Sequence, residues 1–177
     1  MAPAPTLAIT VNNLQRINLA LVLVIIVVAA AVYLAGGRQP DEAPLRLTSV
    51  DPAGVSSITV EQRGGMTIRF VKAGQVWAMT APVQGPANPA RINAMLAILQ
   101  SQSFARIDSN AIEPGRFDLL QPAVVLTLND QRFTFGGSNP LEGRRYVLYD
   151  GTVHLLNDNL YHQLLQPAEF FLAPPSG

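Results

Sequence analysis

The sequence predicts an α+β fold, in which an N-terminal single transmembrane helix precedes a mostly antiparallel β domain built from hairpin-plus-helix blocks. Three observations predict it. The first is one long apolar run without charge, residues 17–35, and the second is a series of β-branched segments separated by turn residues. The third is Asn88 followed by proline, a pair that opens an amphipathic segment in the manner of a helix cap.

The apolar run 17–35 approaches the ~20 residues that cross ~30 Å of hydrocarbon. Arg16 and Arg38 flank it, and Tyr33 lies where an interfacial aromatic residue would anchor the helix. A cleaved signal sequence is the alternative, but its apolar region is typically only ~7–15 residues long. We therefore expect an uncleaved signal anchor in a bacterial inner membrane, with the N-terminus cytoplasmic and the C-terminal domain periplasmic.

The rest of the chain divides into a tail over 1–16, a Gly/Pro-containing linker over 36–44 and an extramembrane domain over 45–173. The 12 Lys and Arg residues balance the 12 Asp and Glu residues, so no basic surface is expected for nucleic acid. The chain has no Cys, which excludes disulfides and Cys-ligated metals. Of the 12 basic residues eleven are Arg, which we interpret as the codon bias of a GC-rich bacterium.

The domain is expected to contain two successive blocks, 55–101 and 123–166. In the first, β-branched residues and glycine turns predict strands over 55–62, 66–72 and 76–80, followed by a helix from Asn88 to about Ser101. In the second, the strands are expected over 124–128, 132–135, 146–149 and 152–156, followed by a short helix that Pro167 stops. Each helix would pack on a mostly antiparallel sheet.

No pattern of residues predicts a catalytic, metal or cofactor site. The two histidines, His154 and His162, lack the spacing of converging metal ligands. Ser138 lies in a Gly-Gly-Ser-Asn-Pro segment that indicates a turn and not the nucleophile elbow of a hydrolase. We therefore expect no enzyme activity and no cofactor.

Candidate contact residues fall in two groups. In the domain, Trp77 is either a core residue or a ligand platform, and the basic doublet Arg144 and Arg145 either binds an anionic group or lies in solvent. In the apolar run, Asn18 and the small-residue pair Ala31 and Ala35 mark either packing against another helix or an ordinary Ala-rich anchor. The candidate contact residues are thus Asn18, Ala31, Ala35, Trp77, Arg144 and Arg145.

The order of several short motifs resembles a bacterial envelope family, domain of unknown function 4340, over about residues 48–165. The motifs are Trp77 with Thr80-Ala81-Pro82, the Asn-Pro helix, Phe117-Asp118-Leu119-Leu120-Gln121-Pro122, Phe135-Gly136-Gly137 and Arg145-Tyr146-Val147. Asp118 stands where the family usually has glycine. The resemblance implies a protein held in the inner membrane by one N-terminal helix, and for some members a link to auxiliary components of gliding-type ABC transporters. It implies no catalytic residue.

Together these observations predict a non-enzymatic, single-pass accessory subunit that presents a small periplasmic domain to a larger inner-membrane complex. Its expected partners are integral membrane protein subunits and membrane lipid, without nucleic acid. The alternative is an envelope module that binds a glycan or lipid through Trp77, Arg144 and Arg145.

Overall fold

A computed structural model describes residues 18, 20–28, 30, 45–140 and 142–174. The chain divides into two units, Met1–Glu42 and Ala43–Gly177.

The first unit does not bear out the predicted membrane anchor. Residues 18, 20–28 and 30 are helical and exposed, Asn18 among them. Within the part of the chain that the structure describes, no helix combines the length and the apolar character that crossing a membrane requires.

This finding overturns the predicted transmembrane helix over 17–35, together with the single-pass, signal-anchored inner-membrane topology inferred from it. The other residues of that predicted span lie outside the described residues, Ala31 and Ala35 included. The predicted tail 1–16 and linker 36–44 also lie outside them.

The second unit is dominated by one antiparallel sheet. Among the described residues, nine strands follow the order β5-β4-β3-β2-β8-β9-β10-β11-β7, and β1 pairs with β6 separately. The strands are β1 (Leu45–Arg46), β2 (Ser57–Gln62), β3 (Thr67–Ala73), β4 (Val76–Ala81), β5 (Gly85–Pro86), β6 (Gln102–Ser103), β7 (Arg106–Asp108), β8 (Val124–Leu128), β9 (Gln131–Asn139), β10 (Arg144–Tyr149) and β11 (Thr152–Asn157).

Helical segments are few and short. The helices are α2 (Pro89–Leu96) and α3 (Tyr161–Leu164), and the 3-10 turns are η1 (Pro52–Gly54), η2 (Ala97–Gln100), η3 (Ser109–Ala111), η4 (Pro114–Phe117) and η5 (Ala168–Phe171). As predicted, Asn88 caps α2: its side chain accepts a hydrogen bond from the amide of Ala90 at 3.0 Å, and Pro89 is the first helical residue.

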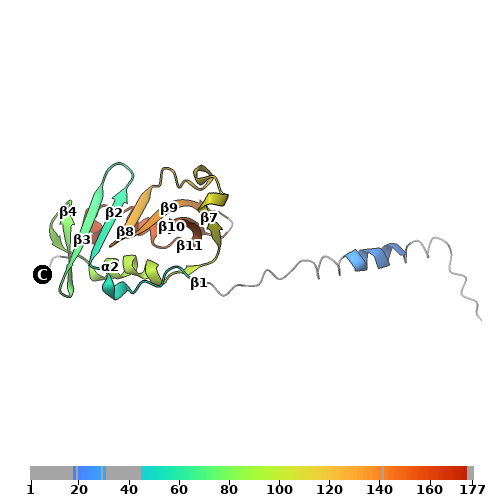
Figure 1. The fold of residues 1–177 in the computed structure, drawn as a ribbon, viewed down its shortest axis with the longest axis horizontal. Coiled ribbons are helices and arrows are strands. Elements are labelled where there is room, and N and C mark those ends of the chain that lie inside the picture. The colour runs from blue at the N-terminus through green and yellow to red at the C-terminus, as the bar shows by residue number, and fades with distance from the viewer. Residues whose placement is uncertain (1–17, 19, 29, 31–44, 141, 175–177) are drawn as a thin grey trace, which may run out of the picture. The chain divides into compact units, whose positions relative to one another are not determined.

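The predicted fold class is corrected accordingly. The expected hairpins form, but their strands do not make two separate hairpin-plus-helix blocks, because β2 pairs directly with β8 and places Ile58 opposite Leu128. The strands of both expected blocks therefore belong to one sheet. The helix expected over 88–101 is α-helical only to Leu96, and α3 spans only Tyr161–Leu164. The described domain is thus mostly antiparallel β with few helices (Figure 1).

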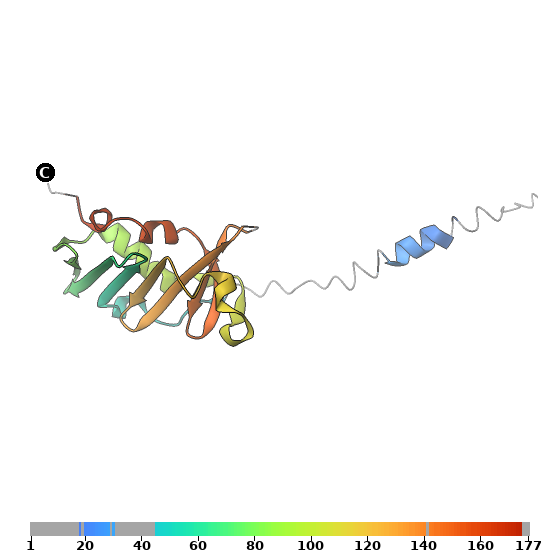
Figure 2. The ribbon, with the colours of Figure 1, turned by 90° about the horizontal axis from the view of Figure 1, so that it is seen from above.

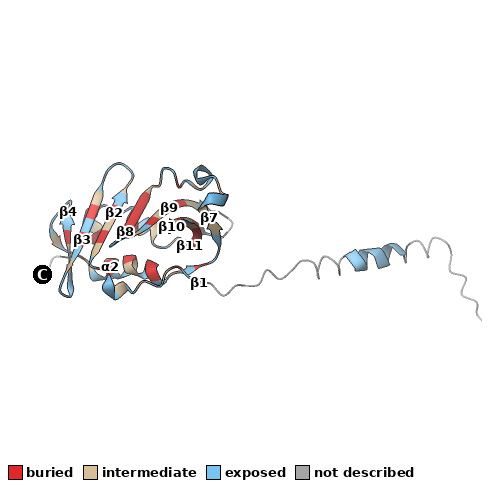
Figure 3. Cartoon of the chain, viewed as in Figure 1, coloured by how far each residue is buried: buried red, intermediate tan, exposed pale blue. Residues whose placement is uncertain are grey.

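One face of the sheet carries the core. Figure 2 shows α2 and the C-terminal helical segment along the same side of the strands, and Figure 3 marks the buried residues on strands and helix alike. Ile92 and Met95 of α2 pack there with Phe70 of β3 and with Phe171 of η5, whose ring meets that of Phe70 edge-on at 5.9 Å. Each such side chain contributes about 1.5–3 kcal/mol on burial.

The opposite face is covered over only part of its width. The segment containing η3 and η4 packs on β9 and β10, where Phe117 meets the ring of Tyr146 at 4.7 Å. Gly136 of β9 allows this approach, because a Cβ at that position would collide with the carbonyl oxygen of Phe117 and lie 2.9 Å from the Leu119 side chain. On β3 and β4, by contrast, Val71 and Val76 remain 47% and 63% exposed.

Candidate functional site

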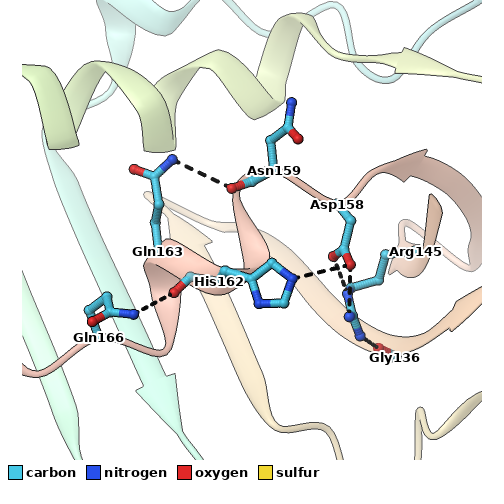
Figure 4. A network of polar contacts seen from close by, with 7 residues as sticks. All are labelled: Gly136, Arg145, Asp158, Asn159, His162, Gln163 and Gln166. Atoms are coloured by element: carbon cyan, nitrogen blue, oxygen red, sulfur yellow. Dashed lines mark hydrogen bonds and ion pairs between the residues drawn. The ribbon is translucent and has the colours of Figure 1, made fainter. Parts of the chain in front are cut away.

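Among the buried polar side chains of the described domain, Arg145 makes the most hydrogen bonds (Figure 4). Its guanidinium donates to both carboxylate oxygens of Asp158, at 2.5 and 3.1 Å, and to the carbonyl oxygen of Gly136 at 2.6 Å. The same group lies 3.3 Å from the centre of the Tyr161 ring. His162 approaches the Asp158 carboxylate at 3.6 Å from the solvent side. Only 7% of Arg145 is exposed, so this cluster joins β9 and β10 to the segment before α3 and is not open to a ligand.

The guanidinium of Arg144, the other residue of the doublet, also has partners within the domain. Its guanidinium donates to Glu142 at 2.6 Å and lies 3.7 Å from the centre of the Phe104 ring. Consecutive residues of a strand point to opposite faces. The structure therefore does not combine Arg144 and Arg145 into one cationic site.

Trp77 does not lie near the doublet either. It belongs to β4, and four strands separate β4 from β10 in the sheet. At ~4.8 Å per strand the two strands are about 24 Å apart. The predicted site of Trp77, Arg144 and Arg145 is therefore not assembled. Trp77 is nevertheless half-buried, with one part of its ring packed on the core.

The exposed part of Trp77 lines a hollow of about 300 Å³ between the β3–β4 hairpin and α2. Trp77 and Lys72 face each other as cross-strand neighbours in β4 and β3. The hollow is lined by Pro52, Ala53, Lys72, Gln75, Trp77, Pro89, Ile92, Asn93 and Leu96. No carboxylate is among these lining residues.

Four side chains of this hollow have hydrogen-bond donors without a partner in the described part of the chain. They are the indole N–H of Trp77, the ammonium of Lys72 and the amides of Gln75 and Asn93. Sequence reasoning identified Trp77 but missed the other three, because they come from β3, from the β3–β4 turn and from α2, and only the fold brings these segments together.

A second hollow, of about 290 Å³, lies between the α2–η2 segment and the β11–α3 segment. Its floor contains Ile98, Phe135 and Leu156, and its rim carries amide side chains. The Gln163 amide on that rim is already engaged, because its oxygen accepts from Arg91 at 3.4 Å and its nitrogen donates to the Asn159 carbonyl oxygen at 3.5 Å.

Ser103 and His154 form a hydrogen-bonded pair that was not predicted from the sequence. The Ser103 hydroxyl lies 2.9 Å from Nδ1 of His154 and 2.9 Å from the carbonyl oxygen of Ala105. Since a hydroxyl has one proton, donation to Ala105 leaves Nδ1–H of His154 as the donor to Ser103. Burial, and secondly the charge of Arg106, lower the pKa of His154 to about 4.

A serine beside a histidine is the arrangement of a nucleophile and its base, but this pair is closed to substrate. Ser103 is 5% exposed and His154 is 4% exposed, and neither residue lines the two hollows. Within the described residues, no group of three or more His, Cys, Asp or Glu side chains is placed to hold a metal ion. The pair is therefore a buried polar bridge between β6 and β11.

The family described as Domain of unknown function (DUF4340) matches residues 77–172, which is more than half of the chain. The protein belongs to this family, as the order of its motifs predicted. The match begins at Trp77 and extends past the expected limit of about residue 165. Asp118, which stands where glycine is usual, keeps a left-handed conformation with φ of 55° at the end of η4. No curated protein and no solved structure matches the chain.

Proposed function

We propose that the protein is a non-enzymatic accessory subunit whose β domain binds a partner protein through the uncovered sheet face of β2, β3 and β4. The observation that carries the proposal is the exposure of Val71 and Val76, at 47% and 63%, on a face that neither the helices nor the η3–η4 segment covers. We call this surface the open face.

The composition of the open face supports a protein partner. Val71 lies opposite Ser57 on one side and Ala78 on the other. The same face also carries the polar side chains of Thr59, Glu61 and Arg69, so it combines exposed apolar residues with polar surroundings, as protein–protein contact surfaces do.

The edges of the sheet argue against docking by strand addition. The terminal strands, β5 (Gly85–Pro86) and β7 (Arg106–Asp108), are short, and Pro86 lacks the amide donor that a further strand would need. The short edges favour docking on the open face instead.

Site-specific photo-crosslinking tests the proposal. A photoreactive residue at position 71 should give one discrete crosslinked protein in cells, and Val71→Glu should weaken binding of that protein about 10- to 100-fold, because burying a valine contributes about 1.5–3 kcal/mol. Leu165→Glu is the matched control, since Leu165 is also exposed but follows α3 on the helix side.

Two outcomes would contradict the proposal. A partner whose affinity is equally reduced by both substitutions, or by neither, does not bind at the open face. A crosslink only to a second copy of the chain, with a dimer that Val71→Glu dissociates in analytical ultracentrifugation, would assign the open face to self-association.

A further inference from the structure

We infer that the hollow beside Trp77 is a binding site for one acidic sugar unit, a pyranose ring that carries a carboxylate. The inference is independent of the proposed partner contact. It rests on the aromatic ring, the unpartnered donors and the single ammonium group that this hollow brings together.

Trp77 supplies the platform for the ring. The C–H groups on one face of a pyranose make an apolar surface, which stacks on an aromatic side chain, while the indole N–H offers a hydrogen bond at the edge. One part of Trp77 packs on the core, and its carbonyl oxygen accepts from the amide of Ala87 at 2.9 Å. The platform is therefore held in place before a ligand arrives, which lowers the entropic cost of binding.

The polar lining selects the substituents of the ring. Gln75 and Asn93 have side-chain amides that both donate and accept, as sugar hydroxyls require. Lys72 is the only lysine of the chain and has no ion pair among the described residues. Lys72 is the one charged residue among those that line the hollow, so its ammonium favours an anionic substituent there.

The size of the hollow limits the ligand to a small one. At about 300 Å³ it is at the lower end of the ~300–1,000 Å³ of small-molecule sites. Its apolar lining is confined to Trp77, two prolines and a few aliphatic side chains, too little for an acyl chain. The second hollow is a weaker candidate, because the Gln163 amide on its rim is already bonded and no lysine or arginine lines it.

Fluorescence of Trp77 gives a direct test, because Trp77 is the only tryptophan of the chain. The full-length protein is titrated with glucuronate, with glucose and with acetate. We expect a saturable change with glucuronate, a weaker one with glucose and none with acetate, which carries the charge without the ring.

Lys72→Met should reduce the affinity for glucuronate about three- to fivefold and leave that for glucose unchanged, as expected for a partly exposed charge contact. Asn93→Ala should weaken both sugars. Arg69→Met is the matched control, because Arg69 lies on the same strand but is exposed on the opposite face. It should change neither affinity.

The inference is overturned by the absence of a saturable signal for glucuronate, by a response to acetate equal to that for glucuronate, or by a preference for glucuronate that persists in Lys72→Met. Circular dichroism of each variant confirms folding. A loss of glucuronate affinity in Arg69→Met as large as that in Lys72→Met would assign the effect to nonspecific charge and also overturn the inference.

Discussion

Removal of the Asp158 carboxylate should destabilise the domain far more than removal of any surface charge. In Asp158→Ala, the guanidinium of Arg145 keeps its hydrogen bond to the carbonyl oxygen of Gly136 and its contact with the Tyr161 ring but loses both hydrogen bonds to the carboxylate. The Arg145 side chain is only 8% exposed, so water reaches it poorly. An arginine keeps its charge in proteins, and the charge is therefore left without compensation.

The magnitude follows from this burial. Removing one partner of a buried ion pair lowers the free energy of unfolding by about 3–5 kcal/mol. The Asp158 side chain is 20% exposed, so some water enters the vacated space, and we expect a loss of about 2–4 kcal/mol. Since a domain has about 5–15 kcal/mol of stability, the variant should fold with a clearly reduced urea midpoint.

The assay is equilibrium urea denaturation at neutral pH, followed by Trp77 fluorescence and by circular dichroism. Glu142→Ala is the matched control, because it removes the carboxylate partner of Arg144, which is more exposed, and should cost at most about 1 kcal/mol. Replacing both Arg145 and Asp158 by apolar residues should recover most of the loss. An Asp158→Ala variant within about 0.5 kcal/mol of the control would refute the reasoning.

Three further predictions concern packing and protonation. Gly136→Ala should cost about 2–3 kcal/mol in urea denaturation because backbone lies against that position, whereas Gly54→Ala, with no atom within 4 Å of its added Cβ, should change stability by less than about 0.5 kcal/mol. The pKa of His154 is about 4 in the fold and 6.5 unfolded, so its contribution to stability is present above pH 6.5 and is lost as pH falls toward 4, at up to about 1.4 kcal/mol per pH unit. His154→Gln should therefore flatten the pH dependence of the free energy of unfolding between pH 4 and 6.5. An unchanged slope in this variant would contradict the assignment. Phe171→Ala should cost about 3–5 kcal/mol and Phe170→Ala clearly less, because only Phe171 is fully buried; equal losses in thermal melts would mean that the C-terminal segment is not anchored as described.

Local structure in the domain could be predicted from residue types. The turn at Asn129 follows from the tolerance of asparagine for positive φ, which is 54° here. The turn at Asp150 and Gly151 has the same cause, with φ values of 46° and 70°. The pairing of β2 with β8 could not be predicted in this way, because the alternating apolar residues of β2 and the nearly continuous apolar run of β8 fit many partners equally well. The membrane helix was predicted from the length of the apolar run, its flanking arginines and Tyr33, but no helix in the described part of the chain is long and apolar enough to cross a membrane.

The site was predicted less well than the fold, for a reason of geometry. Arg144 and Arg145 are adjacent in sequence, which suggested one cationic patch, but alternation along β10 gives them different partners. Ser103 and His154 are 51 residues apart, and no spacing rule links them. Of the candidate residues in the domain, Trp77 lines one of the two described hollows, and its neighbours there come from segments whose packing the sequence does not reveal.

The β3–β4 hairpin places the two proposed surfaces back to back. Val71 and Lys72 are consecutive in β3, as Val76 and Trp77 are in β4, so each strand sends one residue to the open face and the next to the hollow. The two proposals can therefore be separated by substitutions one residue apart. Val71→Glu should weaken the partner contact and leave the glucuronate titration unchanged, and Lys72→Met should do the reverse. If either substitution impaired both activities while the domain stayed folded, the hairpin would act as one binding surface, because the alternation alone would not keep the two faces independent.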